Sequence, residues 1–117
     1  MSCLFDSLSY YFNVKSDIIR NEICNYLEHN APLFDDIPTN VVLDVIDEDY
    51  IAKMRERETW GGGIEISAAC NIWKLVIVVH SHHMKPVVFE PLDKKYLHVI
   101  HLLWTGNHYE PIRTANS

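Results

Sequence analysis

The stretch Leu75-Val76-Ile77-Val78-Val79-His80 divides this sequence into two unlike parts. Its five consecutive apolar residues, most of them β-branched, are typical of a buried β-strand. Three more strand patterns follow, at residues 86–90, 96–104 and 109–113, and a Thr105-Gly106-Asn107 turn precedes the last of them. The last third of the chain is therefore predicted to form a sheet.

The residues before this stretch follow helical periodicity instead. Helices are predicted for residues 3–12, 16–29, 41–58 and 64–73. Ser16 is expected to cap the second helix, and a break near Asp47 could split the third in two. One side of the third helix is expected to be apolar, through Val42, Val45, Ile46, Tyr50, Ile51 and Met54.

Helices followed by strands predict an α+β fold, with a small, mostly antiparallel central sheet sandwiched between helical layers. A chain of 117 residues and 13.6 kDa can bury one hydrophobic core and is too short for two. We therefore expect a single domain over residues 1–117, and a monomer.

The composition narrows the classes of function. A net charge of −6 and a pI near 5.5 argue against nucleic acid or an anionic membrane as the main partner and favour protein partners. Three cysteines without a Cys-x-x-Cys pair are typical of a reducing compartment. The N-terminus lacks a signal-peptide pattern, and no apolar run approaches the roughly 18 residues of a membrane span. These features predict a soluble, intracellular, cytoplasmic protein.

A cysteine opens the first predicted helix, and a histidine lies near the other end of the chain. Unpaired backbone N–H groups and the helix dipole at Cys3 favour an anion, which poises its thiol towards thiolate. His108 could accept that proton and return it to a leaving amine. Residues 108 and 110 share one face of an extended chain, so Glu110 could orient the imidazole. The alternatives are a buried structural cysteine and an ordinary exposed glutamate.

Three consecutive glycines, in Thr59-Trp60-Gly61-Gly62-Gly63, allow another backbone to approach closely. A tight turn between two helices is the simpler interpretation. Neither a Gly-Lys-Ser/Thr sequence after the glycines nor a strand before them is present, which excludes a phosphate loop and a dinucleotide fold.

Histidines cluster at residues 80–83, where His80, His82 and His83 could bind a transition metal. Nothing nearby supplies the matching cysteines or carboxylates of a four-ligand zinc site. We therefore expect a polar hairpin tip, no metal and no cofactor. His98 and His101 lie on opposite faces of a predicted strand and are expected to be packing or surface residues.

Three segments, taken in order, resemble the ovarian-tumour (OTU) family of cysteine deubiquitinases. They are Cys3-Leu4-Phe5 followed by Ser7-Leu8, Trp60-Gly61-Gly62 followed by Ile64-Glu65-Ile66 and Ala68, and Val99-Ile100-His101-Leu102-Leu103 leading through Gly106-Asn107 into His108-Tyr109. The resemblance spans residue 3 to about residue 112. It implies a papain-like fold with a small central sheet between helical layers, and the size is similar to that of minimal viral OTU domains.

The resemblance also implies an activity, which is hydrolysis of the isopeptide or peptide bond after the C-terminal Gly-Gly of ubiquitin. Ubiquitin or polyubiquitin would be the partner, with a ubiquitin-like modifier as an alternative substrate, and a viral protein would act in the host cytoplasm. Carried over by position, Cys3 is the nucleophile, His108 the general base and then general acid, and Glu110 the orienting third member.

The same resemblance places the substrate channel along Trp60, Gly61 and Tyr109. The sequence departs from the family pattern in two places. Family members usually carry a sequence such as Asp-Gly-Asn before the cysteine, which helps to build the oxyanion hole, whereas only Met1-Ser2 precede it here. Glu110 stands where Asp or Asn is usual, and its extra methylene changes the reach of the carboxylate.

Three hypotheses of function follow from these features. The first is an active OTU-like cysteine protease, and the second is a catalytically inactive ubiquitin-binding module of the same fold, motivated by the short segment before Cys3. The third is a metal-dependent hydrolase or metal-binding protein that uses His80, His82 and His83.

Overall fold

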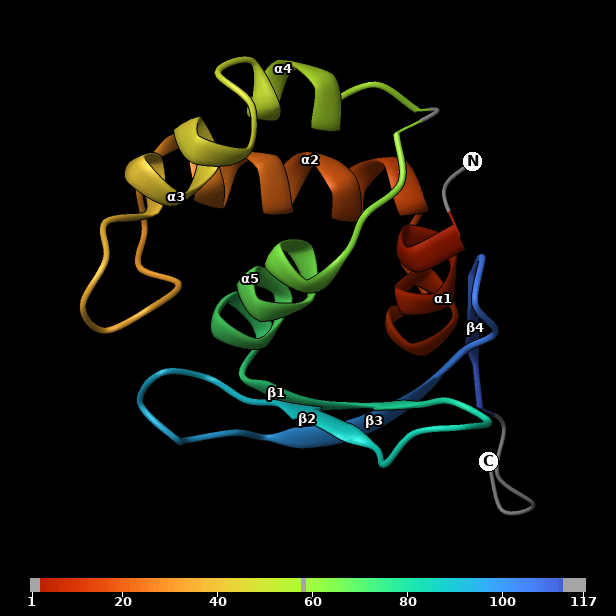
Figure 1. The fold of residues 1–117 in the computed structure, drawn as a ribbon. Helices are drawn as coiled ribbons and strands as arrows, with labels where there is room; N and C mark the ends of the chain where they lie inside the picture. Colours follow the sequence, from red (N-terminus) through yellow and green to blue (C-terminus); the bar gives the residue numbers. More distant parts are fainter. Residues whose placement is uncertain (1–2, 58, 113–117) are drawn as a thin grey trace.

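The computed structural model describes residues 3–57 and 59–112, and this part of the chain forms an α+β fold of five helices and four strands (Figure 1). The predicted α+β class is confirmed. The elements are α1 (Cys3–Phe12), α2 (Ser16–Glu28), α3 (Thr39–Ile46), α4 (Tyr50–Met54), α5 (Gly63–Trp73), β1 (Leu75–His80), β2 (Val87–Phe89), β3 (His98–Trp104) and β4 (Tyr109–Pro111).

The four strands form one sheet in the order β2-β1-β3-β4. The pairs β1–β2 and β3–β4 are antiparallel, but the central pair β1–β3 is parallel, in a register that joins Leu75 to His98 and His80 to Leu103. The sheet is therefore mixed, and the expectation of a mostly antiparallel sheet is corrected. The predicted last strand extended to residue 113, which lies outside the described residues.

The path between β1 and β3 explains the parallel pairing. β2 returns along the outer edge of β1 and ends near the beginning of that strand, since Ile77 pairs with Phe89. Residues 90–97 then carry the chain to the other edge of β1, where the Leu97 amide donates to the Lys74 carbonyl at 2.7 Å. The chain thus enters β3 beside the start of β1 and runs in the same direction.

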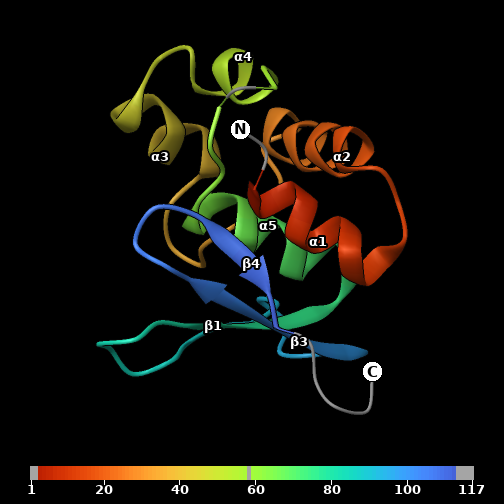
Figure 2. The ribbon, with the colours of Figure 1, turned by 90° about the vertical axis from the view of Figure 1, so that its right-hand side faces the viewer.

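The described helices all lie on one face of β1, β2 and β3 (Figures 1 and 2). This arrangement corrects the expected sandwich between helical layers. The opposite face stays open, and its Val88 and Val99 are exposed. Because both faces of these strands carry β-branched residues, the sequence pattern alone could not tell a covered face from an open one.

The hydrophobic core lies between the helices and the inner face of the sheet. It joins side chains from α1, α2 and α5 to β1 and β3, among them Leu4, Phe5, Leu8, Ile19, Ile23, Leu27, Ile66, Ile77 and Leu102. The predicted stripe of Ile19, Ile23 and Leu27 is buried as expected. Burial of the first turn of α1 fixes the position of that helix start.

The region of α3 and α4 differs in part from its prediction. The break near Asp47 is confirmed, because Asp47 has extended backbone dihedrals between the two helices. Val45 and Ile46 were expected on the apolar side of the helix but are 82% and 56% exposed, while Leu43 is buried. The break gives each short helix its own direction, so one continuous apolar stripe does not form. Ser16 is the first residue of α2 rather than its cap.

The described helices include none that is both long and apolar enough to cross a membrane.

Candidate active site

Cys3 is the first residue of α1, and its side chain is partly exposed. Leu4 and Phe5, the next two residues, are fully buried, so the helix start is anchored in the core. The Ser7 hydroxyl donates to the Cys3 carbonyl at 2.8 Å within this first turn. The thiol is therefore held at the helix N-terminus, where the backbone dipole favours an anion.

The other two cysteines have a different environment. Cys24 and Cys70 are both buried, and burial raises the pKa of their thiols to about 11 and about 12, respectively. A thiol that stays protonated and inaccessible is a poor nucleophile. Cys3 is consequently the candidate nucleophile among the three.

The fold brings Cys3 next to the last described strand. A cavity of about 430 Å³ is lined by Cys3, Asp6 and Ser7 from α1 and by Tyr109, Glu110 and Pro111 in β4. Burial, and to a smaller extent the nearby charge of Cys3, raises the pKa of Tyr109. Cys3, Tyr109 and Glu110, all predicted site residues, thus share one cavity.

His108 lies just before β4, after the turn that joins it to β3. Its Nε2 atom is 3.3 Å from Oε1 of Glu110, which fits the predicted placement of the two side chains on one face. Its Nδ1 atom is 2.9 Å from Asn107 Oδ1 and 3.1 Å from Thr105 Oγ1. His108 does not line this cavity. It contacts Glu110, which does line it together with Cys3. Gly106 has a φ of 107°, a backbone conformation that favours glycine in this turn.

A tyrosine missed by the sequence analysis joins α1 to the strands that carry the histidine. The Tyr11 hydroxyl lies 2.7 Å from the carbonyls of both His101 and Ile112. His101 lies in β3, and Ile112 directly follows β4 and donates its amide to the His101 carbonyl at 3.1 Å. Figures 1 and 2 show the turn between β3 and β4 at the end of α1 that carries Cys3.

The glycine turn, defined here as residues 59–63, approaches the same helix start. A Cβ atom at Gly61 would lie 2.7 Å from Leu4 Cδ2 and 3.0 Å from Phe5 Cζ, so glycine is needed for the close contact. Trp60 is half exposed and lines a different cavity, of about 410 Å³, together with Tyr50 and Glu65. Of the three predicted channel residues, Gly61 and Tyr109 lie beside α1 or its cavity, and Trp60 does not line the Cys3 cavity.

A buried carboxylate, also missed, holds the glycine turn. Glu65 is 1% exposed, and its side chain accepts from the Gly62 amide at 2.7 Å and from the Tyr50 hydroxyl. Burial raises the pKa of Glu65 in spite of these hydrogen bonds. Glu65 lies three residues after Gly62, the residue just before α5, and this capping-box spacing could have predicted the contact from the sequence.

The histidines at residues 80–83 lie at the end of β1 and in the hairpin connection to β2, which confirms the predicted hairpin tip. His80 Nε2 lies 2.9 Å from Nδ1 of His101 on the neighbouring strand β3. His82 and His83 lie beyond the end of β1, with their ring centroids 6.5 Å apart. Within residues 3–57 and 59–112, no three or more metal-binding side chains gather into one group.

The site combines a helix-terminal thiol, a histidine and a carboxylate, which together define the class of thiol hydrolases. Comparisons agree with this class. The OTU-like cysteine protease family matches residues 2–109. Ubiquitin thioesterase OTU1 of Drosophila pseudoobscura pseudoobscura is 28% identical over 116 residues, which cover 95% of this chain and 31% of that protein. The chain spans about a third of the length of the curated relatives it matches first.

Solved structures share the fold. An OTU domain in complex with ubiquitin has a TM-score of 0.74 and 26% identity, over 94% of this chain and 62% of that one. The viral OTU domain protease from Dera Ghazi Khan virus has a TM-score of 0.69 and 20% identity, over 94% and 72%. The chain therefore belongs to the OTU-like cysteine protease family. Similar proteins occur in an insect and in a virus, so a viral origin of this chain stays a prediction.

Proposed function

We propose that this chain is a deubiquitinase, which hydrolyses the isopeptide or peptide bond after the C-terminal Gly-Gly of ubiquitin. The observation that carries the proposal is the cavity in which Cys3 and Glu110, from opposite ends of the chain, lie together. Family membership supports the chemistry, and similarity to an OTU domain in complex with ubiquitin supports the substrate. A ubiquitin-like modifier with the same C-terminal glycines is the alternative substrate.

The reaction assigns one role to each polar group. The Cys3 thiol gives its proton to His108, and Sγ attacks the carbonyl carbon of the terminal glycine. His108 passes that proton to the departing lysine amine, so the C–N bond breaks and a thioester remains. His108 then takes a proton from water, which attacks the thioester and releases the carboxylate of ubiquitin together with the Cys3 thiol.

Glu110 determines which nitrogen of the imidazole acts as the base. If Nε2–H donates to Glu110, the lone pair of the neutral ring lies on Nδ1. Nδ1 then leaves Asn107 and Thr105 to face Cys3. This reorientation is compatible with catalytic hydrogen bonds that form only when substrate is bound.

A ubiquitin-binding module without catalysis is the second candidate. It is favoured by the position of His108, which stays outside the cavity lined by Cys3. This module would bind ubiquitin and leave its chains intact.

Cleavage of polyubiquitin by the purified chain and by its Cys3→Ala variant tests the proposal. We expect cleavage by the unchanged chain and none by the variant, with the same circular dichroism spectrum for both. Cleavage retained by Cys3→Ala would contradict the assignment of the nucleophile. Binding of ubiquitin without cleavage by the unchanged chain would establish the second candidate instead.

A further inference from the structure

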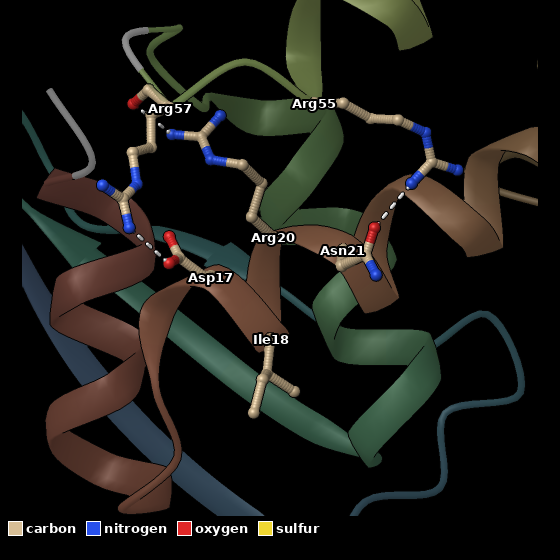
Figure 3. Close-up of a pocket in the computed structure, with 6 residues that line it drawn as sticks. All are labelled: Asp17, Ile18, Arg20, Asn21, Arg55 and Arg57. Atoms are coloured by element: carbon tan, nitrogen blue, oxygen red, sulfur yellow. Dashed lines mark hydrogen bonds and ion pairs between the residues drawn. The ribbon is translucent and has the colours of Figure 1, made fainter.

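A second cavity, of about 420 Å³, lies between α2 and the segment that follows α4 (Figure 3). It contains three arginines within an acidic protein. The lining residues are Asp17, Ile18, Arg20, Asn21, Arg55 and Arg57.

Two of the arginines bind acceptors on α2. Arg57 Nη2 is 2.7 Å from Asp17 Oδ2, and Arg55 donates to Asn21 Oδ1 at 2.7 Å and to Glu28 Oε2 at 2.6 Å. These guanidinium groups already have protein acceptors, so the cavity is a poor site for a free anion. Figure 3 shows Arg55 and Arg57 on opposite sides of Arg20.

Arg20 differs from both because it is 3% exposed and binds main-chain carbonyls. Its Nη1 atom donates to the Met54 carbonyl at 2.7 Å. Its Nη2 atom donates to the carbonyls of Arg57 at 3.0 Å and Thr59 at 2.9 Å. One planar group therefore holds main-chain carbonyls at the end of α4, at Arg57 and at the first residue of the glycine turn.

Arg20 also touches the helix that carries Cys3. Its guanidinium carbon lies 4.2 Å from the centre of the Phe5 ring, a cation–π contact. The Phe5 ring also lies beside the glycine turn, because a Cβ atom at Gly61 would be 3.0 Å from Phe5 Cζ. The side chain of Arg20 thus bridges the glycine turn and the first turn of α1.

We propose that Arg20 is a positioning residue, which holds the glycine turn against the first turn of α1 and thereby fixes the position of Cys3 at which the ubiquitin tail must bind. This inference rests on the proposed deubiquitinase function. Arg20 touches neither the substrate nor the reacting atoms, and it acts through the Thr59 carbonyl and the Phe5 ring. Lysine cannot replace it, because one ammonium group lacks the planar fork that reaches three carbonyls.

The test compares Arg20→Lys with Arg55→Gln, a matched loss of the guanidinium group in the same cavity that leaves the glycine turn untouched. Steady-state cleavage of ubiquitin carrying a C-terminal fluorogenic amide gives kcat and KM. The rate of alkylation by iodoacetamide reports on the thiol itself. Intact mass after alkylation reports on folding, because an unfolded chain would also expose Cys24 and Cys70.

We expect Arg20→Lys to raise KM about tenfold, since small misplacements of a binding site are costly. Its alkylation rate should stay within about twofold of the unchanged chain, with one adduct per molecule. Arg55→Gln should leave KM, kcat and alkylation within about twofold, as for a partly exposed polar contact. Equal KM values for Arg20→Lys and Arg55→Gln would overturn the inference.

The design separates this inference from the function on which it rests. If the unchanged chain does not cleave the ubiquitin amide, the proposed function fails, whatever the variants do. If Arg20→Lys does not fold, Phe5→Leu replaces it, because this change removes the ring between Arg20 and Gly61 and keeps an apolar core side chain. An unchanged KM in a folded Phe5→Leu protein would then overturn the positioning role.

Discussion

At the scale of single residues, burial separates the three cysteines. Cys3 is partly exposed at a helix start, whereas Cys24 and Cys70 are buried in the core with raised thiol pKa values. Reaction with a small electrophile requires both access and thiolate. Only one of the three thiols meets the first requirement in the folded protein.

Iodoacetamide should therefore add once to the folded chain and three times to the chain in denaturant. Intact mass gives the number of adducts, and peptide mapping should place the single adduct on Cys3. The Cys3→Ala variant is the control and should remain unmodified when folded. Modification of Cys24 or Cys70 under native conditions would contradict the described burial.

Glu65 is a carboxylate buried in the core of this fold. Burial raises its pKa, so the folded chain holds the proton more tightly than the unfolded chain does. The stability that this group contributes is fully present below the unfolded pKa of about 4.3 and is lost as the pH rises through the folded pKa.

A Glu65→Gln variant should therefore change the pH dependence of unfolding. Glutamine keeps the shape and stays neutral, so the free energy of unfolding of the unchanged chain should fall relative to that of the variant as the pH rises above the unfolded pKa of about 4.3. Each unit by which the folded pKa is raised corresponds to roughly 1.4 kcal/mol. Urea unfolding of both proteins across this range measures the difference, and a constant or rising difference would refute the prediction.

At the scale of elements, α1 is held from two directions. The glycine turn contacts its first turn through Gly61, and the Tyr11 hydroxyl joins its other half to the carbonyls of His101 and Ile112. The position of Cys3 depends on these contacts between elements that are remote in sequence.

Gly61→Ala should destabilise the protein, because its methyl group would lie 2.7 Å from Leu4 Cδ2. Overpacking of this kind costs about 1–3 kcal/mol. Urea unfolding should show that loss, and cleavage of ubiquitin substrates should decline with it. Gly62→Ala is the matched control: a Cβ there meets nothing within 4 Å, so the loss should stay below about 1 kcal/mol. Equal stability of the two variants would count against the close approach.

The elements themselves were largely predictable from local patterns. The period of Ile19, Ile23 and Leu27 and the β-branched run that begins at Leu75 identified α2 and β1 correctly. The relative direction of the strands was not predictable, because the parallel β1–β3 pairing depends on the route of residues 90–97 and not on either strand alone. The side of the sheet on which the helices pack was not predictable either. Val45 and Ile46 were misplaced because a break at Asp47 changes which face of each helix is inward.

At the scale of the whole molecule, the fold joins the two ends of the chain. Cys3 and Glu110 are more than one hundred positions apart in the sequence and line one cavity. The helix start, strand alternation and the resemblance to the OTU family all pointed to Cys3 and Glu110, whereas Tyr11 and Arg20 have no local motif and were found only through their contacts with distant main-chain carbonyls. Residue types with chemical signatures were thus predictable, and residues that position them were not.

The central claim is that Cys3 is a nucleophile directed at the C-terminus of ubiquitin. Incubation with ubiquitin that carries a C-terminal electrophile, followed by intact mass, tests it most directly. We predict one ubiquitin adduct on the unchanged chain, none on Cys3→Ala, and slower formation on His108→Ala. An adduct that persists on Cys3→Ala, or a folded chain that forms none although iodoacetamide modifies Cys3, would contradict the claim.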